Sequence, residues 1–425
     1  MDGVKKNDYI TCGCRTDVRY LILADDLTGA LDTGLQLRRL GIPTKVLAEY
    51  SPENRLEREC VPALVINTNS RHVCPQKAYQ TVREICREAS RCQIDCLYKK
   101  TDSALRGNIG AELAAIADAG YATIYFAPAY PKLHRITRDG KQLIHQIPVD
   151  QSPFGRDHLN PIKTASIPEL LWAARLPCTV VRQETELDSL RGRRGIVVFD
   201  AETDERLGRI ADWIAAVPEK FALAGCAGFA EHLRPILRYD QPLEEPETVT
   251  YDGLIVISGS LNPLSFAQAQ AAARTGFNIL SAADFPGFID RDDFVITPEI
   301  TQKVLHAYAK NPRLIIETAN QSGASGSVAE NLKAGQRVAN HFGALVKALR
   351  QKGVAGLFVV SGGDTLGGIV KHMGGHSIEP LREIEPGVVL ANILTGSGTC
   401  QFITKSGGMG SAEVYCLIQD TFLNR

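Results

Sequence analysis

Short apolar runs alternate with segments of helical periodicity along the first half of the chain. The apolar runs predict strands at 20–24, 45–48, 63–67, 121–126 and 195–200. Between them, apolar residues recur three or four positions apart over 27–41 and 76–91, which predicts amphipathic helices. Strands that alternate with helices are typical of a mainly parallel sheet covered by helices on both faces. The stretch 132–161 is rich in prolines, glycines and histidines and has little periodicity, so we expect a long loop there.

The same alternation restarts after an acidic, proline-bearing stretch at 242–247, which predicts a linker. Strands are expected at 253–257, 314–317, 356–360 and 388–393, and helices from Asn262–Pro263 to Gly276 and over 327–350. A chain of 425 residues is too long for one ordinary core. We therefore predict an α/β protein of two domains with mainly parallel sheets. Its parts are an N-terminal extension at 1–18, a first domain at 19–241, a linker at 242–250 and a second domain at 251–425.

Two turns that follow strands in the first domain carry the polar residues expected of a binding site. These residues are Asp25 and Asp26 in one turn, and Lys100, Thr101, Asp102 and Ser103 in the other. The carboxyl ends of parallel strands share one edge of a sheet, and helix N-termini there offer unpaired N–H groups. We therefore expect one site for a small, polar, anionic substrate. Arg71 also follows a strand, and it is either a solvated loop residue or a clamp for the anion.

Three glycine-rich turns, at 258–260, 361–365 and 405–411, follow apolar runs in the second domain. Glycines let backbone N–H groups approach phosphate oxygens, so three such turns predict a nucleotide site. Neither G-x-x-x-x-G-K-[ST] nor a G-x-G-x-x-G after a strand is present, so neither common phosphate motif forms it. If the nucleotide at this site donates a phosphoryl group, the reaction needs Mg²⁺ and a group that orients the attacking hydroxyl. Asp364 and Thr365 either cap their helix or bind a ribose hydroxyl or a metal, with Asp364 the candidate for the metal. Asp25, Asp26 and Asp102 are candidates on the hydroxyl side.

The charge balance favours a small-molecule partner. Lys and Arg number 47 against 48 Asp and Glu, a net charge of -1, so we expect no binding to nucleic acid or to an acidic membrane. No apolar run reaches about 18 residues and the first twenty residues are polar, so we expect neither a membrane span nor a signal peptide. A cytoplasmic protein follows from this composition. The sequence leaves open whether the chain forms a homo-oligomer.

Six motifs, in this order, resemble the four-carbon acid sugar kinase family: ADDLTGA at 24–30, KTDSALRG at 100–107, FAPAYP at 126–131, SGS at 258–260, SGGDT at 361–365 and KSGG at 405–408. The resemblance extends over nearly the whole chain after about residue 18. It implies a sugar-acid-binding N-terminal domain and a nucleotide-binding C-terminal domain, with the active site in the cleft between them. The implied reaction is ATP-dependent phosphorylation of the terminal hydroxyl of an acid such as D-threonate, D-erythronate or 3-oxo-tetronate.

Carried over by position, the resemblance implies roles for individual residues. Substrate contacts fall to Asp25, Asp26, Arg71, Lys100, Thr101, Asp102 and Ser103, and ATP contacts to Ser260, Gly362, Gly363, Asp364, Thr365 and Gly408. It identifies neither the catalytic base nor which acid and stereoisomer is used. A regulatory protein that binds the acid and the nucleotide without turnover is the alternative. A phosphatase is disfavoured, because Asp25-Asp26-Leu27-Thr28 lacks the spacing of the D-x-D-x-T nucleophile loop.

Overall fold

The computed structural model describes residues 17–51, 56–157, 160–239, 249–318, 328–396 and 398–423. The strands are β1 (Tyr20–Ala24), β2 (Thr44–Leu47), β3 (Ala63–Asn67), β4 (Cys96–Lys100), β5 (Thr123–Ala127), β6 (Arg135–Arg138), β7 (Lys141–Ile144), β8 (Ile147–Pro148), β9 (Cys178–Val181), β10 (Gly195–Phe199), β11 (Ala222–Gly225), β12 (Leu254–Ser258), β13 (Asn278–Ser281), β14 (Arg313–Glu317), β15 (Leu357–Ser361), β16 (Gly375–Glu385), β17 (Val388–Thr395) and β18 (Gly398–Lys405). The α-helices are α1 (Leu27–Arg39), α2 (Pro75–Ala89), α3 (Ile109–Asp118), α4 (Ile167–Ala173), α5 (Asp204–Ala215), α6 (Ala227–Ala230), α7 (Pro263–Arg274), α8 (Pro298–Lys310), α9 (Val328–Gln351), α10 (Gly363–His372) and α11 (Val414–Phe422). Short 3-10 helices are η1 (Leu56–Arg58), η2 (Pro131–Leu133), η3 (Val149–Gln151), η4 (Pro153–Arg156), η5 (Glu184–Leu190) and η6 (Ala282–Asp284).

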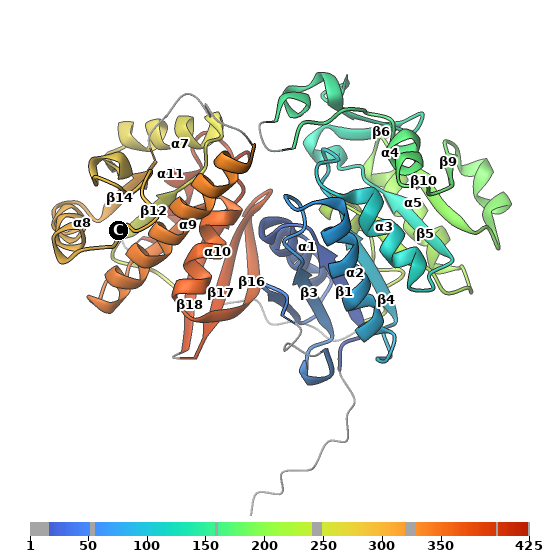
Figure 1. The fold of residues 1–425 in the computed structure, drawn as a ribbon, viewed down its shortest axis with the longest axis horizontal. Helices are drawn as coiled ribbons and strands as arrows, with labels where there is room; N and C mark the ends of the chain where they lie inside the picture. The colour runs from blue at the N-terminus through green and yellow to red at the C-terminus, as the bar shows by residue number, and fades with distance from the viewer. Residues whose placement is uncertain are drawn as a thin grey trace, which may run out of the picture.

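One mixed sheet of 15 strands runs through both halves of the molecule, in the order β13-β14-β12-β15-β18-β17-β16-β2-β3-β1-β4-β11-β5-β10-β9 (Figure 1). The five strands at one end are parallel to one another, as are the eight from β2 to β9. Between these blocks, β16 and β17 pair antiparallel with each other and with their outer neighbours β2 and β18. The predicted α/β class with mainly parallel pairing is confirmed, and β16 joins the two halves.

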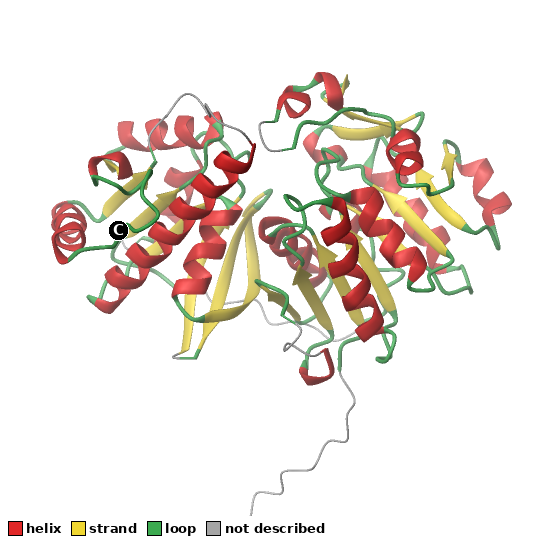
Figure 2. Ribbon diagram, in the orientation of Figure 1, coloured by secondary structure: helices red, strands yellow, loops and turns green. Residues whose placement is uncertain are grey.

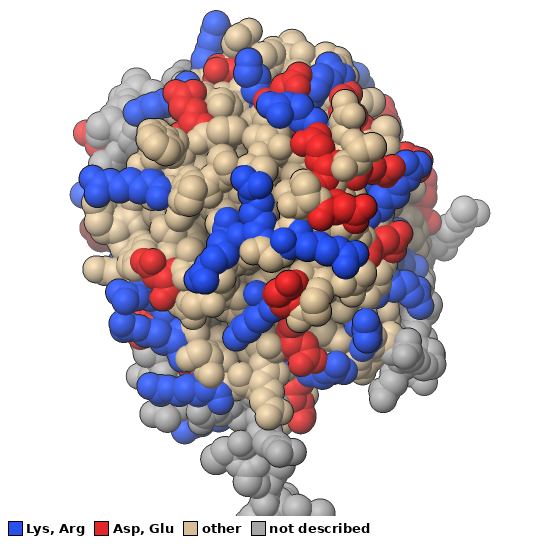
Figure 3. Space-filling view, turned by 90° about the vertical axis from the view of Figure 1, so that its right-hand side faces the viewer, with Lys and Arg blue, Asp and Glu red and all other residues tan. Residues whose placement is uncertain are grey.

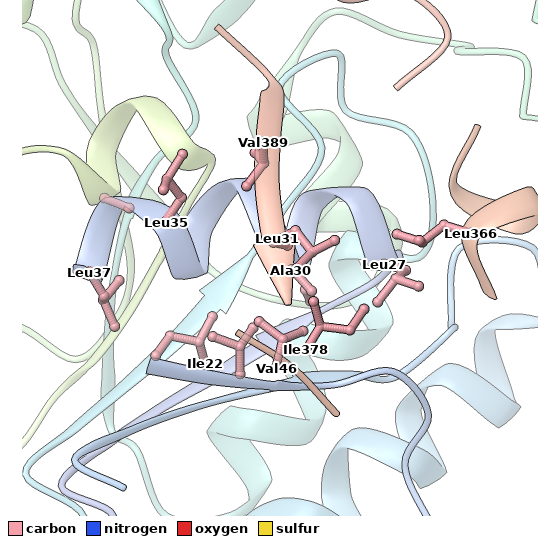
Figure 4. Close-up of a cluster of buried hydrophobic side chains, with 14 of the residues drawn as sticks. Ile22, Leu27, Ala30, Leu31, Leu35, Leu37, Val46, Leu366, Ile378 and Val389 are labelled. Carbon is pink, nitrogen blue, oxygen red and sulfur yellow. The ribbon is translucent and has the colours of Figure 1, made fainter. Parts of the chain in front are cut away.

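Helices cover the sheet on both faces (Figure 2), and α1 lies at the junction of the two halves. Leu27, Leu31 and Leu35 recur every fourth residue on α1 and are buried. Figure 4 shows this apolar side between Ile22 and Val46 of the N-terminal half and residues of the C-terminal half, among them Ile378 of β16, Val389 of β17 and Leu366 of α10. The two halves therefore share one hydrophobic core around α1.

The expectation of a long loop over 132–161 is wrong, because β6, β7 and β8 form a small antiparallel sheet there. The turn between β6 and β7 is Asp139-Gly140, with φ of 51° and 68°. Positive φ at both central residues is the tight hairpin turn that an Asp-Gly pair favours. Strands of four residues are too short for a visible period, so this dipeptide was the available sequence signal. Residues 1–16 of the predicted extension and 242–248 of the predicted linker lie outside the described residues, as do 240–241 at the end of the predicted first domain.

Charges of both signs are interspersed on the face of the N-terminal half that ends the sheet (Figure 3). This face therefore presents no large surface of one sign, in keeping with the net charge of -1. Among the helices of the described ranges, none combines the length and the apolar character needed to cross a membrane.

Candidate functional site

In the N-terminal half, five neighbouring strands end level with one another. Asn67, Ala24, Lys100, Gly225 and Ala127 lie side by side in register at the carboxyl ends of β3, β1, β4, β11 and β5. Each of the predicted substrate-side residues belongs to this row or lies within four residues after it in the chain. Register therefore brings together turns that are up to 80 residues apart in the sequence, as parallel strands require.

Arg71 is the centre of an ion-pair network that joins these turns. Its Nε and Nη2 donate to the two oxygens of Asp25 at 2.7 and 3.1 Å, and its Nη1 and Nη2 donate to those of Asp26 at 2.9 and 2.8 Å. The third neighbour is Asp102, 3.6 Å from Nη2. Arg71 is buried, so it is not a solvated loop residue. Three carboxylates already surround its guanidinium, which makes it an organiser of the site and leaves it little capacity to clamp an outside anion.

Asp25 and Asp102 are held in their ionised forms. Burial opposes ionisation of Asp25, but Arg71, Lys100 and Lys99 together lower its pKa to about 2. Burial also opposes ionisation of Asp102, yet Arg106 and Arg71 hold its pKa well below the usual range. Arg106 donates to both Asp102 oxygens, at 2.9 and 3.0 Å. A carboxylate with so low a pKa accepts a proton poorly, so these two residues are better suited to positioning than to general-base catalysis.

Lys99 and Lys100 point to opposite faces of β4, as successive strand residues do. Lys99 is fully buried and pairs with Glu112 of α3 at 3.1 Å, and Ser70 donates a hydrogen bond to the same carboxylate. Lys100 lies against α1, where a β-carbon on Gly29 would overlap its ammonium group. Within the described ranges, the ammonium group of Lys100 has neither a hydrogen bond nor an ion pair within 4.0 Å, although the residue is buried. The ammonium group of Lys99 is thus paired within the protein, whereas that of Lys100 has N–H donors available.

The C-terminal half has a matching row of strand ends. Glu317, Ser258, Ser361 and Lys405 lie side by side at the ends of β14, β12, β15 and β18. The three glycine-rich turns follow three of these residues, and they touch one another. A β-carbon on Gly259 would overlap Thr365 Oγ1, and one on Gly407 would overlap Ser260 Oγ. The convergence expected of the three turns is therefore present, and it requires glycine at these contacts.

Gly362, with φ of 115°, is the N-cap of α10. The capping role considered for Asp364 is therefore wrong: Asp364 lies in the first turn of the helix, exposed, and makes no hydrogen bond or ion pair with any described residue. Lys405 is 1% exposed, and its Nζ donates to Ser361 Oγ at 3.1 Å and to Gly407 O at 3.4 Å. Burial lowers the pKa of Lys405 to about 7.

The substrate-side and nucleotide-side turns meet at the N-termini of α1 and α10. A β-carbon on Gly363 would lie 3.3 Å from Thr28 Oγ1 and 3.8 Å from Thr28 N. Six steps in the strand order separate β15 from β1, and each step turns the sheet by roughly 20–25°, about 120–150° in total. The two parallel blocks run in opposite senses within the sheet, so this accumulated twist brings their carboxyl edges toward each other.

A hollow of about 610 Å³ lies elsewhere, between α2, α3 and α4. Its lining includes Tyr79, Arg83 and Ala114 and none of the predicted site residues. The candidate site is therefore defined by converging side chains and helix N-termini at the junction of the two halves.

Two family models match the chain, one over each half. A sugar-binding N-terminal domain matches residues 20–233 and a nucleotide-binding C-terminal domain matches residues 255–414. The chain is 26% identical over 426 residues to the D-threonate kinase of Salmonella typhimurium, with 94% of this chain and 97% of that protein aligned. It belongs to the four-carbon acid sugar kinase family.

Other relatives in the family carry different substrate names. The D-erythronate kinase of Heliobacterium modesticaldum is 26% identical, with 95% of this chain and 97% of that protein aligned. The 3-oxo-tetronate kinase of Pseudomonas fluorescens is also 26% identical, with 92% and 94% aligned. A solved structure of a Haemophilus influenzae protein has the same fold, with a TM-score of 0.70, 20% identity, and 95% of this chain and 100% of that chain covered.

Several site residues of this family member were missed by sequence reasoning. They are Arg106 beside Asp102, Arg135 on β6, Asp32 one turn into α1, Glu317 at the end of β14, and Lys405, which lay in a quoted motif without a role. Strand register explains why Glu317 and Lys405 lie at the site, since each is the last residue of a strand in the nucleotide-side row. Burial raises the pKa of Asp32 to about 7, despite the opposing charge of Lys100. Nothing in the local sequence marks this aspartate, because its burial arises from the packing of α1 at the junction.

Proposed function

We propose that this protein transfers the terminal phosphoryl group of ATP to the C4 hydroxyl of a four-carbon sugar acid such as D-threonate, D-erythronate or 3-oxo-tetronate. The observation that carries the proposal is the contact between Thr28 on the sugar-binding side and Gly363 on the nucleotide-binding side. Phosphoryl transfer needs the acceptor hydroxyl and the γ-phosphate in line at one point, and here the two sets of turns meet. The names of the relatives support the same reaction class.

The nucleotide side has the features that ATP and Mg²⁺ require. Ser260, Gly362, Gly363, Thr365 and Gly408 supply close backbone and hydroxyl groups for phosphate oxygens. Asp364 is an exposed carboxylate with no partner among the described residues, and Mg²⁺ is usually held by one or two carboxylates together with phosphate oxygens. We assign Asp364 to the metal, which when bound would neutralise phosphate charge.

The three substrate-side carboxylates have unequal roles in this proposal. An arginine holds each of the three through both oxygens, but the Asp26 side chain is 21% exposed, against 2% for Asp25 and 8% for Asp102. Asp26 accepts a hydrogen bond from Thr28 Oγ1 at 2.7 Å, and Thr28 is the residue that a β-carbon on Gly363 would meet across the junction. Asp26 is therefore the best placed of the three to orient the acceptor hydroxyl. A loose phosphoryl-transfer transition state needs such positioning more than proton removal.

Purified protein supplied with Mg-ATP and each of these acids should release ADP, and the neutral tetroses should serve as matched non-substrates. The phosphorus NMR signal of the product should be a triplet, because a phosphate ester on a terminal CH₂ couples to two protons. A doublet would move the reaction to an inner hydroxyl. If both ligands bind but no acid releases ADP above the water blank, the chain is a sugar-acid- and nucleotide-binding regulatory protein.

A further inference from the structure

Arg135 opens strand β6 of the small antiparallel sheet and reaches the substrate-side turn. Its Nη1 donates a hydrogen bond to Ser103 Oγ. From the neighbouring strand β7, Gln142 Nε2 donates to the Ser103 carbonyl at 2.9 Å. The small sheet is thus fastened to the turn that follows Lys100, and Arg135 joins the residues at the carboxyl edge of the N-terminal half.

The Arg135 guanidinium has no acidic partner within 4.0 Å in the described part of the chain. Asp102, the acidic residue next to Ser103, is occupied through both oxygens by Arg106 and also faces Arg71. One side of Arg135 lies over the Phe154 ring, 5.4 Å from its centroid. A hydroxyl and an aromatic face do not neutralise a full positive charge.

An arginine cannot shed its proton at neutral pH, so a partly buried one needs a counter-charge. Burial lowers the pKa of Arg135 from its ordinary value, and the nearby Asp102 offsets only part of this effect. Arg71 and Arg106 differ, since carboxylates of the chain already occupy them. Of these three arginines, Arg135 is the one whose planar fork is open to a carboxylate from outside.

Unpartnered polar groups gather around the same turn. Thr101 Oγ1 and Asp32 Oδ1 are buried and have no hydrogen-bond partner among the described residues. Lys100 lies near Asp32 and Asp25 and has free donors. A donor-and-acceptor set of this kind suits the hydroxyls of a short polyol chain, once its charged end is held elsewhere.

We propose that Arg135 binds the carboxylate of the substrate, with Thr101, Asp32 and Lys100 facing its hydroxyls. The inference rests on the proposed function and deepens it, because it names the residue that separates a sugar acid from a neutral sugar. It gives Arg135 the clamping role that was one of the two alternatives for Arg71 in the sequence. The acid is then anchored beside Ser103, with its other end free to extend toward Thr28 and Gly363.

The test compares Arg135→Gln with Arg138→Gln, which lies on the same strand but is exposed and pairs with Glu202. Binding of D-threonate, D-erythronate, 3-oxo-tetronate and the neutral amides of these acids is measured by calorimetry without nucleotide, so turnover is not needed. Arg135→Gln should weaken acid binding by about 30-fold to a few thousand-fold and abolish the preference for acid over amide. Arg138→Gln should keep both, and ATP affinity should stay within a few-fold in each variant.

Arg135→Lys retains the charge without the fork, so it should lie between the wild type and Arg135→Gln, and it decides the matter if Arg135→Gln fails to fold. The inference would be overturned if Arg135→Gln kept its affinity for the acid or its preference for acid over amide. A wild type that binds none of the three acids would also overturn it. If the wild type prefers the acid through Arg135 but never forms ADP, the inference stands and the proposed kinase activity fails.

Discussion

Gly363 and Thr28 face each other where the two halves of the molecule meet, with a β-carbon on Gly363 placed 3.3 Å from Thr28 Oγ1. Each residue lies in the first turn of a helix, α10 and α1, so the positive ends of two helix dipoles point to one region. A phosphoryl group passing between the halves would face the N-termini of both helices. The junction therefore brings the two sets of turns close together and stabilises negative charge at the point where they meet.

Gly363→Val should separate ligand binding from turnover. The added side chain would press on Thr28, and misplacement by about 1 Å can cost roughly 100-fold in rate. We expect kcat to fall by about 10- to 100-fold while the acid, measured without nucleotide, binds within a few-fold of the wild type. Gly367→Ala is the matched control, because a β-carbon there meets nothing within 4 Å on the same helix. Equal kcat values for Gly363→Val and the wild type would remove the junction from the reaction path.

The strand-end turns were predictable because each is a local pattern, an apolar run followed by polar or glycine-rich residues. The strand pairing that brings the turns of the two halves together is not a local pattern. β16 spans 11 residues with several register shifts and pairs with β2, about 330 positions earlier, so no window of sequence displays that contact. Arg135 was missed for a similar reason, since its importance depends on which carboxylates other arginines have already occupied.

Lys99→Met should destabilise the N-terminal half strongly. The change would leave the Glu112 carboxylate buried and without its cation, and breaking a buried pair from one side typically costs about 3–5 kcal/mol. Urea unfolding at pH 7 measures the loss. Burial already raises the pKa of Glu112, and removing Lys99 would raise it further, so the deficit should shrink as pH falls and the carboxyl becomes protonated.

The double variant Lys99→Met/Glu112→Gln is the control for that experiment, because it removes both charges and should recover most of the stability. A single variant as stable as the wild type at pH 7 would mean that Glu112 is not held as an anion by Lys99.

Asp364→Asn should raise the Mg²⁺ concentration needed for half-maximal activity and lower kcat by at least about 10-fold, because an amide is a weaker ligand for this cation. Acid binding without nucleotide should not change, since Asp364 belongs to the C-terminal half. Asp293→Asn, an exposed aspartate of the same half paired with Arg291, is the matched control and should behave as the wild type. An unaltered Mg²⁺ dependence would assign the metal to another group.

Because Lys405 is a buried lysine, the protein should become more stable as pH rises, which is the opposite of the effect of a lysine whose pKa is raised by an ion pair. Its pKa is lowered by burial from 10.5 to about 7, so between these values the folded state has released a proton that the unfolded state retains. Stability rises with pH wherever the unfolded state binds more protons, here by up to about 1.4 kcal/mol per pH unit. The cost of the buried charge is fully present below pH 7 and disappears as pH rises toward 10.5.

Lys405→Met should therefore be most stable relative to the wild type at pH 6, and urea titrations at pH 6 and 9 should show this advantage shrinking. The exposed Lys371→Met, on α10, is the control and should show no such trend. A wild-type minus Lys405→Met difference that stays constant from pH 6 to 9 would mean that this ammonium remains charged beneath the glycine-rich turns.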